Sequence, residues 1–454
     1  MNYTESLDKL LGLTDLERVS GHGPHIRRYD LGRMEAFLEG LGNPHLKTPT
    51  VHVTGTKGKG STAASIASVL AVQGYTPGLF TSPHLHTFRE RIQFDGQPVS
   101  EPEFASLVED IWPVMEAVNA EESYGPITTF EMLTAMAFLY FHRRQAGFQV
   151  IEVGLGGRLD STNLVQPQVC VVTSISLDHT HVLGSTVEKI AHDKAGIIKP
   201  GSIAVTSPQQ PGVMKVLEKA CREQNVTLVP VENECQWTRE SFDLDGQTFT
   251  VSAPWGDFHL RTPLLGEHQL ENVTTALVTL QVLNDLGFTI SRNSLDKGFR
   301  SVHWPGRMEV LSQEPLLVVD GAHNPYSAAR LRQTLHDYFS FDRLIYVVGL
   351  SADKNVSGII QELAQDAATV IVTRSRHPRA TSSGVLASGF KERGIDALEI
   401  DGVDAALKYA LDHAGAGDLI MVTGSIFVAA EAREVTLGIP PELYPSLRPE
   451  AQVP

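Results

Sequence analysis

The chain has 454 residues, 42% of them hydrophobic, which is enough apolar material for about two or three packed cores. Its 37 Lys and Arg against 53 Asp and Glu give a formal charge of −16, which argues against a broad nucleic-acid face or an anionic membrane surface. The three cysteines form no CxxC pair, and neither a signal peptide nor an apolar run of about 18 residues is present, so a reduced cytoplasm is expected.

Strand-like and helical patterns alternate through the first two thirds of the chain. Residues 50–54 predict a strand, a glycine-rich turn follows, and residues 61–73 predict an alanine-rich helix. Alternating apolar residues at 237–260, with Asp-Gly at 245–246, predict a β-hairpin. Further strands are predicted at residues 78–80, 149–153, 169–173 and 174–177, and further helices at residues 129–145, 186–195 and 267–286. This alternation predicts a parallel sheet with right-handed crossovers.

A second, smaller α/β domain is predicted from residue 303 onward. Residues 303–307 (HWPGR) carry Pro and Gly and predict a linker, and the tail from Pro440 is proline-rich and expected to pack loosely. Strands are then predicted at residues 316–320, 344–349, 369–373 and 419–423. The predicted fold class is α/β. A P-loop ATPase-type parallel-sheet domain with a small β-hairpin insertion spans residues 1–302, and a Rossmann-like C-terminal domain spans residues 303–454.

The strongest local signal is the segment VTGTKGKGS at residues 53–61, between a predicted strand and a predicted helix. Glycines let the backbone wrap around an anion, and the amides at a helix N-terminus point toward it. Lys59 supplies a positive charge for the outer phosphates of a nucleotide. The spacing differs from the usual G-x-x-x-x-G-K-[ST], since Val53 replaces the first glycine and Gly60 follows the lysine. The loop predicts nucleoside triphosphate binding without indicating a reaction.

Polar residues follow several predicted strands, at ends that meet at one edge of a parallel sheet. Magnesium beside nucleotide phosphates takes hydroxyl and carboxylate oxygens, so Ser82 and Glu152 are candidate ligands. His179 is an uncommon magnesium ligand and, taken alone, is more often structural. Lys194, taken alone, is more often a solvated helix lysine.

Eight motifs occur in a fixed order between about residue 28 and residue 325: GTKGKGS, TSPHL, EVGLGGRLDSTN, SLDHTHVLG, IAHDKAGIIKPG, GEHQLENV, HWPGR and DGAHNP. TGSIF at residues 423–427 extends the series. Together they resemble folylpolyglutamate synthase and the bifunctional dihydrofolate synthase, of the Mur-type peptide ligase superfamily. One departure is Lys57, where the family often carries Asn, so nucleotide affinity is expected to shift.

The resemblance implies ATP and Mg²⁺ as cofactors, with two metal sites. ATP would be bound by Gly58, Lys59, Gly60, Ser61, Asn272, Arg307 and Asp320. One metal would be held by Ser82 and Glu152, and a second by His179. Lys194 matches a lysine that the family carries as a carbamate, a carboxylate-like group beside the metals. Lys59, Lys194 and His323 would be the residues closest to the chemistry.

The resemblance also implies where the other substrates bind. The incoming amino acid would lie near His323 and Ser425. The pterin-bearing substrate would contact Arg28, Tyr29, Asp30, Thr128, Thr129, Phe130, Glu131, Leu159, Asp160 and Ser161. The implied reaction joins L-glutamate to a folate, to dihydropteroate, or to both, through an acyl phosphate. A cytoplasmic monomer is expected, acting on small molecules without a nucleic-acid or membrane partner.

Three other functions compete with this interpretation. A muramoyl-peptide ligase needs a separate domain before the phosphate loop, and about fifty residues are too few for one. A phosphate-loop kinase or NTPase would not need Glu152, His179 and Lys194 together with a second domain bearing DGAHNP. A binding module without activity is disfavoured because Lys59, Glu152 and Lys194 are all present.

Overall fold

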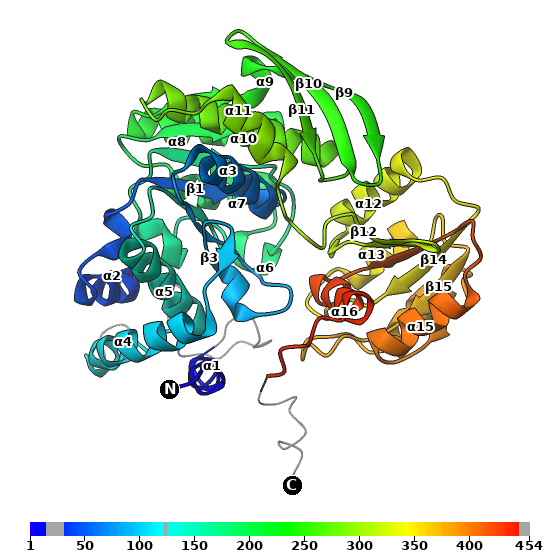
Figure 1. Ribbon diagram of the computed structural model, residues 1–454. Coiled ribbons are helices and arrows are strands. Elements are labelled where there is room, and N and C mark those ends of the chain that lie inside the picture. The colour runs from blue at the N-terminus through cyan, green and yellow to red at the C-terminus, as the bar shows by residue number, and fades with distance from the viewer. Residues whose placement is uncertain (15–30, 122–124, 445–454) are drawn as a thin grey trace.

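A computed structural model describes residues 1–14, 31–121 and 125–444. The chain forms a larger N-terminal α/β domain and a separate, smaller C-terminal α/β domain, each built on a mostly parallel sheet (Figure 1). The predicted fold class is therefore confirmed. The boundary near residue 303 stays a prediction; helix α11 (Arg292–Arg300) precedes it and strand β12 (Glu309–Gln313) follows it.

The N-terminal domain is built on an eight-stranded sheet with the order β4-β3-β2-β5-β1-β6-β7-β8. The strands are β1 (Thr50–Thr54), β2 (Gly78–Phe80), β3 (Ile92–Phe94), β4 (Gln97–Pro98), β5 (Gln149–Glu152), β6 (Val169–Val172), β7 (Ile203–Thr206) and β8 (Thr227–Pro230). Strands β3 and β4 form an antiparallel edge, and the other six run parallel. Parallel neighbours need long crossover connections, which accounts for the alternation seen in the sequence.

Helices cover both faces of this sheet. One face packs against α3 (Lys59–Gln73), α10 (Glu267–Asp285) and α11. The other packs against α1 (Tyr3–Leu11), α2 (Leu31–Gly40), α4 (Glu101–Ala120), α5 (Thr129–Arg143), α7 (Val187–Lys194) and α8 (Pro211–Gln224). Short helical turns complete the domain: η1 (Pro44–Leu46), η2 (Phe88–Arg91), η3 (Ser161–Leu164), η4 (Ala195–Ile197), α6 (Thr180–Leu183) and α9 (Val231–Glu234). Two covered faces explain why every residue of the central strands β1, β5 and β6 is buried.

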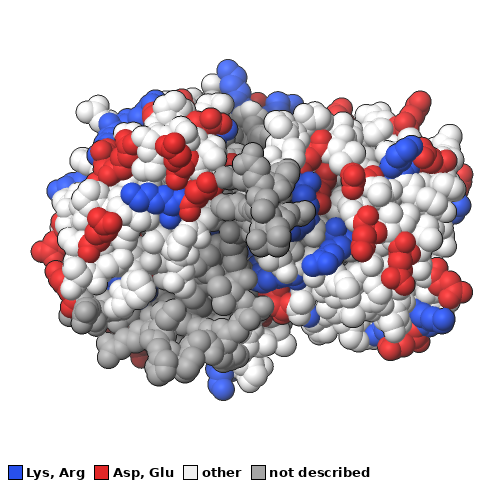
Figure 2. Space-filling model, turned by 90° about the horizontal axis from the view of Figure 1, so that it is seen from below, with Lys and Arg blue, Asp and Glu red and all other residues white. Residues whose placement is uncertain are grey.

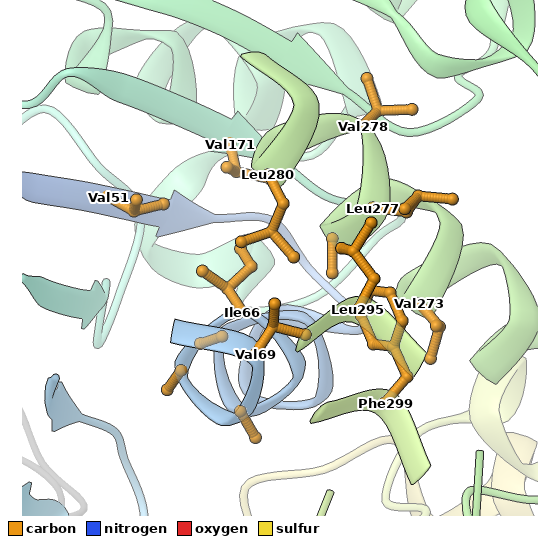
Figure 3. Packing of buried hydrophobic residues seen from close by; sticks show 14 of the residues in the cluster. Val51, Ile66, Val69, Val171, Val273, Leu277, Val278, Leu280, Leu295 and Phe299 are labelled. Carbon is orange, nitrogen blue, oxygen red and sulfur yellow. The ribbon is translucent and has the colours of Figure 1, made fainter. Parts of the chain in front are cut away.

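Helix α3, which begins at the phosphate loop, is held by the packing shown in Figure 3. Ile66 and Val69 are fully buried, and they lie beside Leu280 of α10 and Leu295 of α11. Gly298 on α11 permits this close contact, because a Cβ there would lie 2.5 Å from the Val69 Cα. The position of the phosphate loop thus depends on the packing of three helices.

Residues 236–262 form a three-stranded antiparallel sheet where a two-stranded hairpin was predicted. Its strands are β9 (Gln236–Asp243), β10 (Gly246–Ala253) and β11 (Gly256–Thr262). The first turn lies at Leu244 and Asp245, one residue earlier than predicted, and Gly246 begins β10. The third strand is explained by burial: Phe249, Val251 and Leu260 join the core beneath α10 and α11, so a single hairpin would leave this face open.

The C-terminal domain has a six-stranded sheet with the order β12-β13-β17-β14-β15-β16, in which only β12 is antiparallel to its neighbour. The remaining strands are β13 (Leu316–Val319), β14 (Arg343–Val348), β15 (Thr369–Val372), β16 (Leu398–Glu399) and β17 (Asp418–Thr423). One face packs against α12 (Pro325–Tyr338), α13 (Val356–Leu363) and α14 (Ser383–Lys391), and the other against α15 (Val403–His413) and α16 (Ile426–Leu437).

Two local predictions were wrong. Residues 174–177 do not form a strand, because β6 ends at Val172 and the following loop lies against the phosphate loop. The Ser174 carbonyl accepts hydrogen bonds from the backbone N–H groups of Thr56 and Lys57, at 2.9 and 3.1 Å. The tail from Pro440 was expected to pack loosely, but its described part, up to residue 444, is held in place. The Glu442 carboxylate accepts hydrogen bonds from side chains of the N-terminal domain.

Charged side chains of both signs cover the described surface. Figure 2 shows acidic side chains spread over both lobes of the molecule and lysine or arginine side chains where the two lobes meet. No helix in the described part of the chain has the length and apolarity needed to span a bilayer.

We expect Gly298→Ala to lower the free energy of unfolding by about 1–3 kcal/mol, because its new methyl group meets the α3 backbone. Urea denaturation followed by circular dichroism measures the change. Gly384→Ala is the matched control: it also lies in a helix, its Cβ meets only the end of the Glu399 side chain at 3.4 Å, and it should be neutral or slightly stabilising. Equal effects at the two sites would contradict the packing described for α3.

Candidate active site between the two domains

A cleft of about 790 Å³ lies between the two domains. It is lined by the loops that follow β1, β2, β5 and β6 of the first sheet and β13, β14, β15 and β17 of the second. In parallel sheets the carboxyl ends of the strands face a common crevice, where ligands bind. Both domains therefore present their polar strand ends to one space.

The phosphate loop connects β1 to α3, and the helix begins at Lys59. Gly58 has a φ of +87°, and a Cβ there would lie 2.1 Å from the Asn272 Oδ1 atom of α10. A Cβ at Gly60 would lie 2.4 Å from the Trp304 ring. Close neighbours require a glycine at both positions, and the backbone conformation requires one at Gly58 as well. The N-terminus of the helix is left facing the cleft.

Glu152, at the end of β5, is buried beside the phosphate loop. The Lys59 Nζ lies 3.8 Å from its Oε1, and the Ser82 backbone N–H donates to its Oε2 at 3.1 Å. Burial raises the pKa of this carboxyl, and the Lys59 charge opposes that rise. A buried carboxylate with so few donors has room for another cation.

Magnesium suits this carboxylate. The described residues contain no group of three or more His, Cys, Asp and Glu side chains that could hold a metal, so any metal here needs other oxygen ligands. Mg²⁺ is usually bound by one or two carboxylates together with waters and substrate phosphates. Glu152 and the neighbouring Ser82 fit that pattern, and both line the cleft.

Lys194 is buried at the end of α7, and its Nζ donates a hydrogen bond to the Gly55 carbonyl at 2.7 Å. Burial and then the Lys59 charge lower its pKa to about 7. A substantial fraction of this amine is therefore neutral near pH 7, and a neutral amine is a nucleophile. The environment differs from that of the solvated helix lysine that the sequence alone suggested.

Asp178 receives donors from both domains. The Lys57 Nζ of the phosphate loop lies 2.9 Å from its Oδ2, and the Asn324 Nδ2 of the second domain lies 3.0 Å from the same oxygen. The Lys354 Nζ, after β14, is 3.8 Å from Oδ1. Burial acts to raise the pKa of Asp178, but the surrounding charges hold it well below its usual range. This carboxylate is one of the electrostatic contacts between the domains, together with the His86–Glu434 pair.

His323 lies beside Lys57 and Asp178. Its Nδ1–H donates to the Gly321 carbonyl at 2.8 Å, which leaves Nε2 as the acceptor facing the Lys57 Nζ at 3.2 Å. The Lys57 charge, and then burial, hold the pKa of His323 well below 6.5. The imidazole is therefore neutral at pH 7, and its Nε2 lone pair accepts the hydrogen bond from Lys57 in the cleft.

Asp320 and Arg307 form the opposite wall. Asp320 is buried and accepts hydrogen bonds from the backbone N–H groups of Met308 and Ala322, at 2.9 and 2.8 Å. Burial raises the pKa of Asp320, and Arg307 opposes that rise. The backbone bonds orient this carboxylate, and Arg307 lines the cleft as a cation.

Comparison with known proteins is consistent with this geometry. Residues 53–280 match the Mur ligase middle domain, and residues 306–426 match the Mur ligase, glutamate ligase domain. The dihydrofolate synthase/folylpolyglutamate synthase of Bacillus subtilis (strain 168) is 35% identical over 413 residues, covering 89% of this chain and 94% of that protein. The chain belongs to the folylpolyglutamate synthase and dihydrofolate synthase family of Mur-type ligases. It is thus an ATP-dependent acid–amino-acid ligase.

Solved structures of this family have the same architecture. Mycobacterium tuberculosis folylpolyglutamate synthase, complexed with ADP and AMPPCP, superposes with a TM-score of 0.88 at 31% identity, covering 97% of this chain and all of that one (100%). An FPGS–AMPPCP–folate complex gives a TM-score of 0.83 at 31% identity, covering 96% of this chain and 100% of the other.

Most residues that the family resemblance implied line the described cleft. These are Gly58, Lys59, Gly60, Ser61, Ser82, Thr128, Phe130, Glu131, Glu152, Leu159, Asp160, Ser161, His179, Lys194, Asn272, Arg307, Asp320, His323 and Ser425. Thr129 does not line it; its hydroxyl lies near the carbonyls of Leu10 and Leu13. Arg28, Tyr29 and Asp30 lie outside the described residues.

Thr128 and Glu131 also have a structural role that the sequence did not reveal. The Glu131 backbone N–H donates to the Thr128 hydroxyl oxygen at 3.3 Å and the Thr128 backbone N–H donates to the Glu131 carboxylate at 2.8 Å, which caps α5. The same carboxylate pairs with Arg33 at 2.8 Å. Both charged side chains are buried. Removing one partner of such a pair costs about 3–5 kcal/mol, so a loss of activity at Glu131 would not by itself show substrate contact.

Several lining residues were missed. Asp178 lies in the SLDHTHVLG motif but was assigned no role, and Lys354 and Arg379 were not considered. Lys354 and Arg379 follow β14 and β15. Polar residues just after parallel strands were taken as candidate ligands in the first sheet, and the same criterion would have found these two in the second. Tyr444 gave no such signal, because it follows no strand and comes from the chain end.

We expect Lys57→Asn to raise the pKa of His323 toward 6.5, because it removes the charge that contributes most to the depression. Histidine NMR resonances followed against pH measure this change. Lys354→Asn should produce a smaller rise, since its charge contributes less than Lys57 and burial. An unchanged His323 titration in the Lys57 variant would show that the two side chains are not in contact in solution.

Proposed function

We propose that this ligase joins L-glutamate to the carboxylate of a folate-type acid, either a folate or dihydropteroate, with ATP as the energy source. The observation that carries the proposal is a single cleft that holds the phosphate loop of one domain and Asp320, His323 and Ser425 of the other. A nucleotide and an amino acid can therefore meet there. Relatives named for this activity, and an FPGS structure with AMPPCP and folate, support the choice of substrates.

In the first step an oxygen of the acceptor carboxylate attacks the γ-phosphorus of ATP. The bond to the β–γ bridging oxygen breaks, ADP leaves, and an acyl phosphate forms. Both reactants are anions, so the rate depends on positioning and on neutralising charge. Lys59, at the start of α3, and Arg307, on the opposite wall, provide that positive charge.

In the second step the neutral amine of glutamate attacks the acyl carbon. Inorganic phosphate leaves from the tetrahedral intermediate, and the nitrogen loses a proton. The His323 imidazole is neutral, so its Nε2 would accept a hydrogen bond from the amine in place of the one that it accepts from Lys57 in this structure. Ser425, which lines the same wall, would contact the incoming amino acid.

Two metal positions are proposed. Ser82 and Glu152 would hold one Mg²⁺, and His179, whose pKa is lowered to about 4 by burial and by the Lys354 charge, would present a neutral nitrogen to a second. Bound magnesium supplies charge neutralisation between the triphosphate and the acceptor carboxylate.

We further propose that Lys194 is carbamoylated. The Nζ ammonium first loses a proton to solvent, and the neutral amine then attacks the carbon of CO₂ and loses a second proton. The cation thereby becomes an anionic carbamate. The lowered pKa of Lys194 supplies the reactive neutral amine, and the position beside Gly55 places the product next to the phosphate loop. An anionic group there would also relieve the repulsion between Lys194 and Lys59.

We infer that the enzyme acts as a monomer, because the described cleft is completed by groups from one chain. The three cysteines are buried and unpaired, which fits a reduced cytoplasm, where ATP is available.

The test is an ADP-release assay with ATP, Mg²⁺ and L-glutamate, comparing tetrahydrofolate with dihydropteroate as acceptor. We expect release that requires both glutamate and an acceptor, and a loss of about 100-fold or more in Lys59→Ala and in Glu152→Ala. Lys219→Ala, at an exposed position on α8, is the control. Near-normal ligation by folded Lys59→Ala or Glu152→Ala protein would contradict the assignment, and hydrolysis independent of glutamate would favour an NTPase.

For the carbamate we expect a carbonyl resonance in ¹³C NMR after equilibration with ¹³CO₂. At constant CO₂ pressure the signal should grow as pH rises through about 7, because deprotonation of Lys194 supplies the reacting form. Lys194→Arg should remove the signal, whereas Lys189→Arg, at an exposed position on the same helix, should retain it. A signal that persists in Lys194→Arg would place the modification elsewhere.

A further inference from the structure

The chain segment that follows α16 leaves the C-terminal domain and returns to the N-terminal domain (Figure 1). Two of its side chains, Glu442 and Tyr444, contact the region around η2. This segment therefore connects the end of the second domain to one wall of the first.

Glu442 anchors the segment. Its carboxylate accepts hydrogen bonds from the Tyr3 hydroxyl at 2.6 Å, from the Thr87 hydroxyl at 2.7 Å and from the Phe88 backbone N–H at 3.1 Å. One of these donors belongs to α1 and the other two lie at the start of η2. Three donors on one carboxylate specify both the position and the direction of the chain there. The next residue but one, Tyr444, is thereby directed at the cleft.

Tyr444 forms part of the cleft wall. Its hydroxyl lies 2.8 Å from the His84 Nε2, and its ring lies 5.8 Å from the Phe88 ring in an edge-to-face arrangement. Phe88 and Phe130 line the same cleft. The wall therefore offers aromatic surfaces on the side of β2.

The sheet order indicates what this wall contacts. Strand β5 separates β2 from β1, so the loop after β2 lies roughly 10 Å from the phosphate loop, at about 4.8 Å per strand spacing. An acceptor acid whose carboxylate reaches the γ-phosphate must extend away from the phosphate loop. On the β2 side its ring portion would meet Phe130 and Tyr444, and the buried Phe88 packs against Tyr444.

We propose that Tyr444 is a specificity-determining residue for the acceptor acid, contacting its aromatic ring portion from the end of the C-terminal domain. This rests on the proposed function. A flat heteroaromatic ring suits the aromatic wall, because ring pairs favour offset or edge-to-face contact. Because Glu442 orients Tyr444, the acceptor pocket is complete only when the segment is seated on η2.

The experiment compares Tyr444→Ala, Tyr444→Phe and Glu442→Gln with the unaltered chain in the ADP-release assay, with tetrahydrofolate and with dihydropteroate. Tyr444→Ala should raise the KM for the acceptor about three- to tenfold, while the KM for ATP changes by less than about twofold. Tyr444→Phe keeps the ring and should stay within about twofold, and Glu442→Gln should change the acceptor KM in the same direction as Tyr444→Ala. Tyr409→Ala, on α15 and outside the cleft wall, is the matched control.

Equilibrium binding of folate, without ATP, gives a second measurement that does not depend on turnover. Weaker binding by Tyr444→Ala and normal binding by Tyr409→Ala would support the proposal even if the unaltered chain released no ADP, a result that would overturn only the proposed ligation. An unchanged acceptor KM and unchanged folate binding in Tyr444→Ala would overturn the inference while ligation stands.

If Tyr444→Ala does not fold, Tyr444→Leu keeps the bulk of the side chain and is judged by the same two measurements. Equal rises in the KM values for ATP and acceptor would also overturn it, because they would indicate a general structural role.

Discussion

The carboxylate of Asp178 pairs with cations and donors from both domains, and the geometry of the cleft depends on it. Lys57 comes from the phosphate loop, whereas Lys354 and Asn324 come from the second domain. Two unit charges 4 Å apart interact by about 4 kcal/mol at an effective dielectric constant near 20. Without an anion between them, the two lysines would repel one another across the domain boundary when no nucleotide is present. Asp178 supplies that anion in the chain itself.

The same principle applies to the rest of the cleft. Lys59, Lys57 and Lys194 come from two neighbouring segments, and a triphosphate would be attracted to all three. Glu152 offsets Lys59, and burial lowers the pKa of Lys194. Positive charge is thus concentrated around the phosphate loop. Lys57 and Lys59 each have a carboxylate nearby, and Lys194 is partly neutral because burial lowers its pKa. That balance fits a site that must be stable before ATP arrives and attractive to it.

Much of the fold and of the first half of the site could be predicted from the sequence. Strand β1, the glycines and Lys59 lie in one short segment, so local conformation alone specifies the phosphate loop. Glu152 ends a strand of the same sheet, and this placed it beside the loop through strand topology. Strand β11 was not predicted, because it depends on burial of Phe249 and its neighbours against distant helices. Residues 174–177 were predicted as a strand, but they form a loop because the Ser174 carbonyl pairs with the distant phosphate loop.

The sequence by itself determined the parallel-sheet domains, the phosphate loop and the ordered motifs that indicate the ligase family, because each depends on residues close together in the chain. Only the tertiary structure decided which charges meet. Lys57 pairs with Asp178 across 121 positions, and Glu442 meets Thr87 across 355. It also decided that Lys194 is buried, which changes an ordinary lysine into one with a pKa of about 7. Burial and long-range pairing arise when segments far apart in the chain pack together, within one domain and between the two, and no local pattern of residues records them.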